Sequence, residues 1–115
     1  MDERLEKALD FSKYRVSIEN RRKAIKRRFD TMQVVHYNNG MFCSDEITIS
    51  FVDTLIRNGY ADAILLDKKS NPVTINDLSE FRQVLLDSYF AATNEYNIEI
   101  QKLAKARSVR KAMEW

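Results

Sequence analysis

The chain has 115 residues, 44% of them hydrophobic and 31% charged, with two glycines and one proline. This composition is typical of one small, helix-rich globular domain with a modest core, and it excludes a disordered chain. A single cysteine excludes an internal disulfide framework and fits a reducing cytosol. No apolar run approaches 18 residues and the first residues lack a signal-peptide core, so we expect neither a transmembrane helix nor a secretory leader.

The net charge of +2 conceals an uneven distribution along the chain. Residues 1–28 contain ten Lys or Arg and five Asp or Glu, a net charge of +5. Residues 29–101 have a net charge of −7 and residues 102–115 one of +4. Either the terminal helices carry a solvated basic surface, or the basic ends pair with an acidic partner or with the acidic middle of a neighbouring copy.

Residues 2–28 are predicted to form the first helix. Its apolar residues lie largely at helical spacing, and arginines interrupt or flank them. The apolar members are Leu5, Ala8, Leu9, Phe11, Tyr14, Ile18 and Ile25, and the arginines are Arg21, Arg22, Arg27 and Arg28. A stripe this thin cannot be buried on all sides. We expect it to pack along the C-terminal helix as one side of a two-helix stalk.

The next segment is predicted to be a β-hairpin. Thr31 to Tyr37 and Met41 to Cys43 are β-prone, and Asn39-Gly40 lies between them. A type I′ turn needs positive φ at both central positions, which Asn and Gly tolerate, so we expect the turn to be centred there.

Ser44 with Asp45 and Glu46 opens a predicted middle helix, which Asn58-Gly59 ends. The competing interpretation is a strand, because residues 47–51 also alternate, but the cap at each end favours the helix. We expect its buried face to consist of Ile47, Phe51, Val52, Leu55 and Ile56.

Ala61 to Leu66 and Pro72 to Ile75 are predicted to form a second hairpin around the polar turn from Asp67 to Asn71. The two hairpins flank the middle helix, and we expect them to join into a small antiparallel sheet that this helix covers. The fold class is therefore α+β in a single small domain, with residues 29–75 as a hairpin–helix–hairpin body.

The last third of the chain is predicted to be one long helix over residues 76–111, with Asn76 as its cap and Asp77 in the first turn. Its apolar residues recur at steps of three or four, at Leu78, Phe81, Leu85, Tyr89, Ala92, Tyr96, Ile100 and Leu103. At 1.5 Å per residue, roughly 35 residues extend about 50 Å, whereas a globule of this size is only about 30 Å across. Part of the helix must project, or pack on another helix or subunit.

No pattern of catalytic or metal-binding residues emerges. His36 and Cys43 supply two soft ligands where a zinc site needs about four, and one Cys–His pair is weak evidence for a nucleophile. Two glycines cannot form a glycine-rich phosphate loop. We therefore predict a non-enzymatic protein with no metal, no cofactor and no catalytic residue.

Two sets of residues are candidates for binding. The apolar face of the long helix predicts a partner-binding set of Tyr89, Tyr96, Ile100 and Leu103, with Trp115 as a frayed tail or an anchor in a neighbour. A basic cluster is a candidate for nucleic acid, for a protein partner, or for a solvated face. It consists of Arg21, Arg22, Lys23, Lys26, Arg27 and Arg28.

Several patterns carry a resemblance to a known group of proteins. They are the paired arginines of the first helix, the hairpin from Val35 to Phe42, the run Asn71 to Ile75 with the following Asp77-Leu78, and the long helix itself. Across residues 21–107 the sequence resembles small, uncharacterised tail-region proteins of tailed bacteriophages. The resemblance brings no catalytic residue and implies a virion tail component or a tail-assembly factor.

These expectations combine into one functional prediction. The chain is expected to be a non-enzymatic bacteriophage structural or assembly protein, in the virion tail or in the host cytoplasm during assembly. It would self-associate, or bind other virion subunits, through its helices. The alternative is a small nucleic-acid-binding regulator that uses the basic N- and C-terminal helices.

Overall fold

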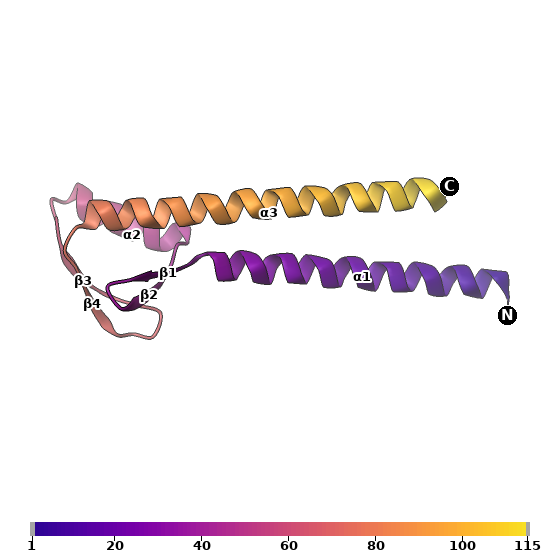
Figure 1. The fold of residues 1–115 in the computed structure, drawn as a ribbon, viewed down its shortest axis with the longest axis horizontal. Helices are drawn as coiled ribbons and strands as arrows, with labels where there is room; N and C mark the ends of the chain where they lie inside the picture. Colours follow the sequence, from indigo (N-terminus) through magenta and orange to yellow (C-terminus); the bar gives the residue numbers. More distant parts are fainter. Residues whose placement is uncertain (1, 115) are drawn as a thin grey trace. The chain divides into compact units, whose positions relative to one another are not determined.

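The computed structural model describes the backbone of residues 2–114 and the side chains of residues 2–106. In chain order the elements are α1 (Glu3–Met32), β1 (Val34–Tyr37), β2 (Gly40–Cys43), α2 (Glu46–Arg57), β3 (Ala63–Leu66), β4 (Pro72–Ile75) and α3 (Leu78–Glu114), as Figure 1 shows. The predicted α+β class is confirmed, with two hairpins flanking a middle helix between two long helices. The described residues divide into two compact units: a helix pair, residues 2–28 with 95–114, and a body, residues 29–94.

The core of the body forms where both hairpins and α2 meet the first turns of α3. Phe81 is fully buried at its centre, and its ring lies 4.9 Å from that of Phe42 and 5.0 Å from that of Tyr37. The other members of this core are Val35, Val52, Leu65, Val73, Ile75, Leu78 and Leu85. The apolar spacing of the long helix therefore predicts its buried face correctly.

The first hairpin differs by one residue from its predicted register. Tyr37 pairs with Gly40, so the two turn residues are Asn38 and Asn39, both with positive φ. Gly40 belongs to β2. A glycine is needed there because a side chain would not fit, and not because the turn requires it. A Cβ at this position would lie 2.6 Å from Cγ2 of Val73 and 2.9 Å from Cε2 of Phe42.

Three predicted boundaries also shift. Helix α1 continues to Met32, so the β-prone Thr31 is helical and β1 begins only at Val34. No glycine or proline stops the helix before this point. Strand β3 begins at Ala63 rather than Ala61. The cap of α3 is Asp77, whose Oδ1 accepts the N–H of Glu80, and not the predicted Asn76.

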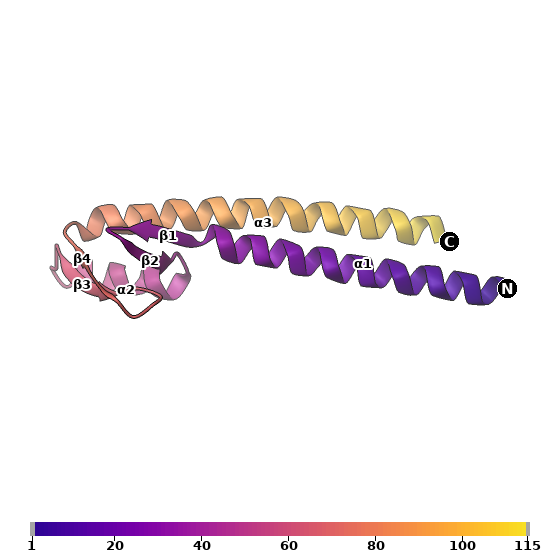
Figure 2. The ribbon, with the colours of Figure 1, turned by 60° about the horizontal axis from the view of Figure 1, so that its bottom comes forward.

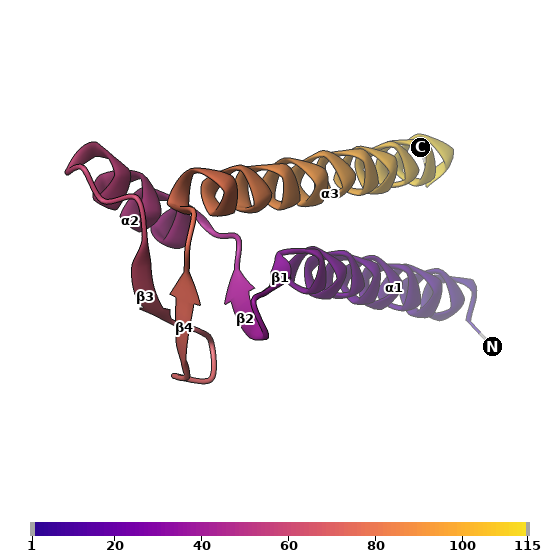
Figure 3. The ribbon, with the colours of Figure 1, turned by 60° about the vertical axis from the view of Figure 1, so that its left-hand side comes forward.

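The two hairpins remain separate two-stranded sheets, so the predicted joint sheet is wrong. Their turns hold them together instead. The side-chain amide of Asn38 donates to the carbonyl of Thr74 at 2.8 Å, and the N–H of Lys68 donates to the carbonyl of Met41 at 2.7 Å. Asp67 accepts the N–H of Met41 at 3.1 Å, so each hairpin satisfies backbone groups of the other. Figure 3 shows the ribbons of the two hairpins.

Helix α2 begins and ends where the sequence predicts. Asp45 caps its start by accepting the N–H of Thr48, and Gly59, with φ of +88°, follows its end. Val52 is fully buried, but Ile47 is 81% exposed and Phe51 is 55% exposed. The predicted buried face is therefore wrong for these two residues.

The helix pair consists of antiparallel segments of α1 and α3, drawn side by side in Figures 1 and 2. Tyr14 donates its hydroxyl to the carbonyl of Ala106 at 3.4 Å, and Arg28 forms an ion pair with Glu95 at 3.5 Å. Between these contacts Leu103 is only 4% exposed. Other apolar residues along the contact are half-buried, namely Ile18, Ile25, Tyr96 and Ile100.

Candidate interaction surfaces

Helix α1 has apolar residues on two opposite faces. Tyr14, Ile18 and Ile25 lie four and seven residues apart, which places them on the face that meets α3. Leu5, Leu9 and Val16 also lie four and seven apart, and they form a second line that we call the outer stripe. Val16 is two residues beyond Tyr14, a rotation of about 200° at 3.6 residues per turn, so the outer stripe points away from α3.

Every member of the outer stripe is exposed: Leu5 to 50%, Leu9 to 41% and Val16 to 54%. None of the 30 residues of α1 is buried. Isolated helices gain little from propensity alone, and most helical stability comes from packing an apolar face. One face of α1 has its partner in α3, and the outer stripe has none within the described chain.

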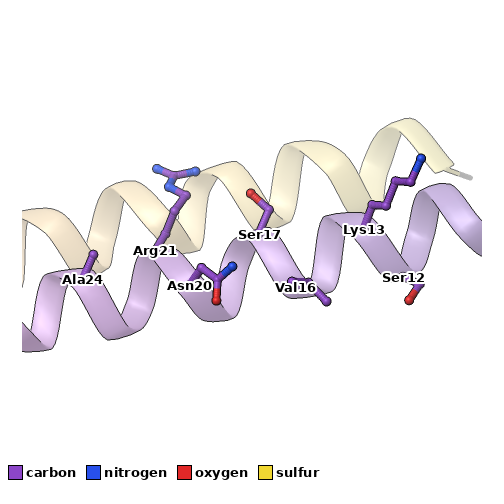
Figure 4. A pocket seen from close by; sticks show the side chains of 7 residues that line it. All are labelled: Ser12, Lys13, Val16, Ser17, Asn20, Arg21 and Ala24. Atoms are coloured by element: carbon purple, nitrogen blue, oxygen red, sulfur yellow. The ribbon is translucent and has the colours of Figure 1, made fainter.

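A shallow groove of about 550 Å³ follows α1 beside the outer stripe. Figure 4 shows Lys13, Ser17 and Arg21 along the edge of α1 nearer to α3, with Val16 on the far edge. The other residues that line the groove are Ser12, Asn20 and Ala24, so small, amide and apolar side chains lie beside two basic ones. Such a groove fits an elongated apolar segment better than a compact polar ligand.

The basic cluster lies on the helix pair. Arg21, Arg22 and Lys23 are exposed, whereas Arg28 is engaged by Glu95. Lys26 and Arg27 are exposed and also make contacts within the chain. The last three residues of the cluster therefore make contacts within the chain. The first three, Arg21, Arg22 and Lys23, form the part of the basic surface that is directed to solvent.

The predicted partner-binding residues occupy different positions. Tyr89 lies in the body, where its hydroxyl donates to Glu46 at 3.0 Å, and this hydrogen bond raises the pKa of Tyr89. Tyr96, Ile100 and Leu103 lie in the helix pair, with Leu103 covered within the single chain. Trp115 lies outside the described residues.

The body carries a second apolar surface that the sequence did not reveal. Glu46 contacts Tyr89 and Asp53 binds Arg82 at 2.8 Å, so α2 and α3 run antiparallel with these residues between them. Ile47 follows Glu46 by one position, and Phe90 follows Tyr89 by one.

In antiparallel helices, one step past the contact line turns both side chains to the same side of the pair. Ile47, Phe51 and Phe90 therefore share one face, which we call the body patch. They are 81%, 55% and 56% exposed. The sequence assigned Ile47 and Phe51 to the core because apolar spacing marks a face without saying whether another element covers it.

The body patch has acidic neighbours. Glu46 lies beside Ile47, and Asp87 lies one helical turn before Phe90. Asp87 accepts a hydrogen bond from Gln83 at 2.8 Å, and Glu46 accepts one from Tyr89. Among residues 2–106, neither carboxylate forms an ion pair. An apolar surface bordered by unpaired carboxylates suits a basic, apolar segment.

The only histidine and the only cysteine lie on the same face of the first hairpin but are not cross-strand partners. His36 pairs across the first hairpin with Met41, and Cys43 pairs with Val34. Burial, together with the nearby Asp45, raises the pKa of the Cys43 thiol, so the thiol stays protonated at neutral pH. Within the described residues no three His, Cys, Asp or Glu side chains gather as a metal site, and no helix is long and apolar enough to cross a membrane.

Comparison with known proteins adds no relative. No protein family, no curated protein and no solved structure matches the chain. The functional interpretation therefore depends on the surfaces described above.

Proposed function

We propose that this chain is a non-enzymatic assembly protein that associates with further copies of itself through the outer face of α1. The observation that carries the proposal is the outer stripe, three apolar side chains in line on a helix that buries none of its residues. Fully burying one Leu or Val side chain contributes roughly 1.5–3 kcal/mol. Three half-exposed side chains therefore represent several kcal/mol that a contact with another subunit would provide.

A bacteriophage tail is the setting that we propose for this assembly. The support is the resemblance of residues 21–107 to small tail-region proteins of tailed phages. A resident virion protein or an assembly helper in the host cytoplasm would both use such a surface. Mass spectrometry of purified virions separates the two, because only a resident protein stays at fixed stoichiometry.

Light scattering coupled to size-exclusion chromatography tests the proposed self-association. The wild-type chain is expected to show a mass that is a multiple of 13.5 kDa, rising with concentration. The variant Leu5→Gln/Leu9→Gln/Val16→Gln keeps good helix formers at the two leucine positions and is expected to be monomeric. A matched control, Ile64→Gln/Leu66→Gln, removes apolar surface from β3 instead, where these side chains are 69% and 67% exposed. A wild-type monomer at high concentration would reject the proposal.

Nucleic-acid binding is a second candidate, favoured by the charge of the helix pair. The segments 1–28 and 95–115 contain fifteen Lys or Arg and eight Asp or Glu, a net charge of +7. Phosphate contacts by Arg21, Arg22 and Lys23 would make binding fall steeply with salt. Titration of duplex and single-stranded DNA and RNA at 50 and 200 mM salt tests this function, and no salt-sensitive binding would remove it.

A further inference from the structure

We infer that the body patch of one copy receives the outer stripe of α1 from the next copy, so that the chain assembles head to tail. The inference rests on the proposed self-association and names the second surface that it needs. Both surfaces are apolar and exposed in the single chain, and they belong to units of opposite net charge.

The apolar match follows from helix geometry. The outer stripe presents Leu5, Leu9 and Val16 along one line of a helix, the arrangement by which amphipathic helices dock into apolar grooves. The body patch spans two neighbouring helices, with Ile47 and Phe51 on α2 and Phe90 on α3. The side-chain ridges of a third helix can pack against such a pair of helices, with its apolar line over the patch.

Charged residues border both surfaces. Lys13 lies one helical turn before Val16, and Lys23 continues the line of the outer stripe seven residues beyond it. The body patch is bordered by Glu46 and Asp87. Asp2, Glu6 and Glu19 also lie one helical turn from members of the outer stripe, so the rim of the stripe carries both signs. The opposite charges that favour one pairing and speed the encounter are therefore those of the two whole units.

The two units as a whole carry opposite net charges. The helix pair has a net charge of +7, and the body, with four Lys or Arg and nine Asp or Glu in residues 29–94, has one of −5. A contact between two helix pairs would place two net charges of +7 side by side, and a contact between two bodies would do the same with two net charges of −5. Only the contact between a helix pair and a body brings opposite charges together.

A contact between different surfaces repeats from copy to copy. An open assembly then keeps one free outer stripe at one end and one free body patch at the other, and growth stops only when a ring closes. The assembly is therefore expected to extend beyond a dimer, as an open chain of subunits or as a ring.

A complementation experiment tests this arrangement. One variant carries Leu5→Gln/Leu9→Gln/Val16→Gln and lacks the outer stripe; the other carries Ile47→Gln/Phe51→Gln/Phe90→Gln and lacks the body patch. Each alone is expected to be a 13.5 kDa monomer. Mixed in equal amounts they are expected to form a complex of two chains and no larger, because one intact stripe and one intact patch remain.

Each other outcome has a defined meaning. If the patch variant assembles like the wild type, or if the mixture remains monomeric, the head-to-tail inference is wrong while self-association itself can stand. If the wild type is a monomer, the proposed function fails before the mixture is tested. The two failures are therefore distinguishable.

A milder variant guards against loss of folding. Glu46→Lys keeps the apolar patch and reverses one charge at its rim, and it is expected to weaken self-association at least fivefold. Asp62→Lys changes the net charge equally at an exposed position after α2, and it is expected to leave association within about twofold of the wild type. Equal effects of the two substitutions would contradict the inference. Circular dichroism of each variant confirms that the helices are retained.

Discussion

At the scale of single residues, position 40 requires glycine because there is no room for a side chain. A Cβ there would lie 2.6 Å from Cγ2 of Val73, a β-branched side chain in β4 with little freedom to move. We expect Gly40→Ala to lower the free energy of unfolding by about 1–3 kcal/mol, the usual range for overpacking. Urea unfolding monitored by circular dichroism measures the change.

Gly59 offers a matched comparison, because its substitution meets a different obstacle. Its φ is +88°, but no atom lies within 4 Å of an added Cβ. Gly59→Ala would therefore cost only the left-handed backbone conformation, about 1 kcal/mol. If Gly40→Ala is no more destabilising than Gly59→Ala, the close packing between the two hairpins is weaker than the distances indicate.

Asp67 predicts a dependence of stability on pH. Its carboxylate accepts the N–H of Asn71 at 2.9 Å, that of Met41 at 3.1 Å and that of Lys69 at 2.9 Å. The pKa of Asp67 is lowered by these bonds, those from Asn71 and Met41 above all. A carboxyl whose pKa is lower in the folded state stabilises the fold above its unfolded pKa of about 3.9. This contribution is lost as the pH falls from that value through the lower folded pKa.

The variant Asp67→Asn tests this effect, because an amide has no charge to lose. Its single acceptor oxygen can replace only one of the two accepting carboxylate oxygens, so the variant also loses hydrogen bonding, and the charge is read from the part of the difference that changes with pH. The wild type is expected to be the more stable protein at pH 6, and its advantage should shrink between about pH 4 and the lower folded pKa. Chemical denaturation of both proteins at several pH values measures the difference. An advantage that is constant with pH would show that the carboxylate charge does not link the hairpins.

At the scale of elements, α2 shows which of two adjacent apolar residues supports the fold. Val52 is fully buried and Phe51 is 55% exposed. Val52→Ala is expected to lower the free energy of unfolding by about 2 kcal/mol, because it leaves a cavity in the core. Phe51→Ala is expected to change it by less than about 1 kcal/mol. Thermal unfolding compares the two, and the reverse order would place the wrong face of α2 in the core.

The same helix shows how far sequence patterns reach. Caps and apolar spacing predicted where α2 begins and ends, because those signals act within a few residues. Which apolar residues are covered depends on elements distant in sequence, so Ile47 and Phe51 were wrongly assigned to the core. Helix α3 was predicted well, since its apolar residues keep one spacing across many turns.

The prediction of the turn in the first hairpin was wrong for a similar reason. The sequence offers Asn38, Asn39 and Gly40, all of which tolerate positive φ, so local signals permit two registers. The packing of Gly40 against Val73 of the second hairpin accompanies the observed register. Neither that contact nor the body patch lies within reach of a local pattern. Leu5 and Leu9 of the outer stripe were among the apolar residues predicted on α1, but Val16 was not. Which apolar line of α1 stays uncovered needed the position of α3.

At the scale of the whole molecule, the opposite charges of the helix pair and the body predict how assembly responds to salt. Salt screens exposed charges, with a Debye length of about 10 Å at 0.1 M and about 3 Å at 1 M. If copies join head to tail, attraction between +7 and −5 is screened, and self-association is expected to weaken severalfold between 0.1 and 0.5 M NaCl. If helix pairs join each other, repulsion is screened instead, and association is expected to strengthen. Sedimentation velocity at both salt concentrations decides between the two by the sign of the change. Glu46→Lys should show a smaller salt effect than the wild type, because it replaces one attractive charge at the body patch by a repulsive one.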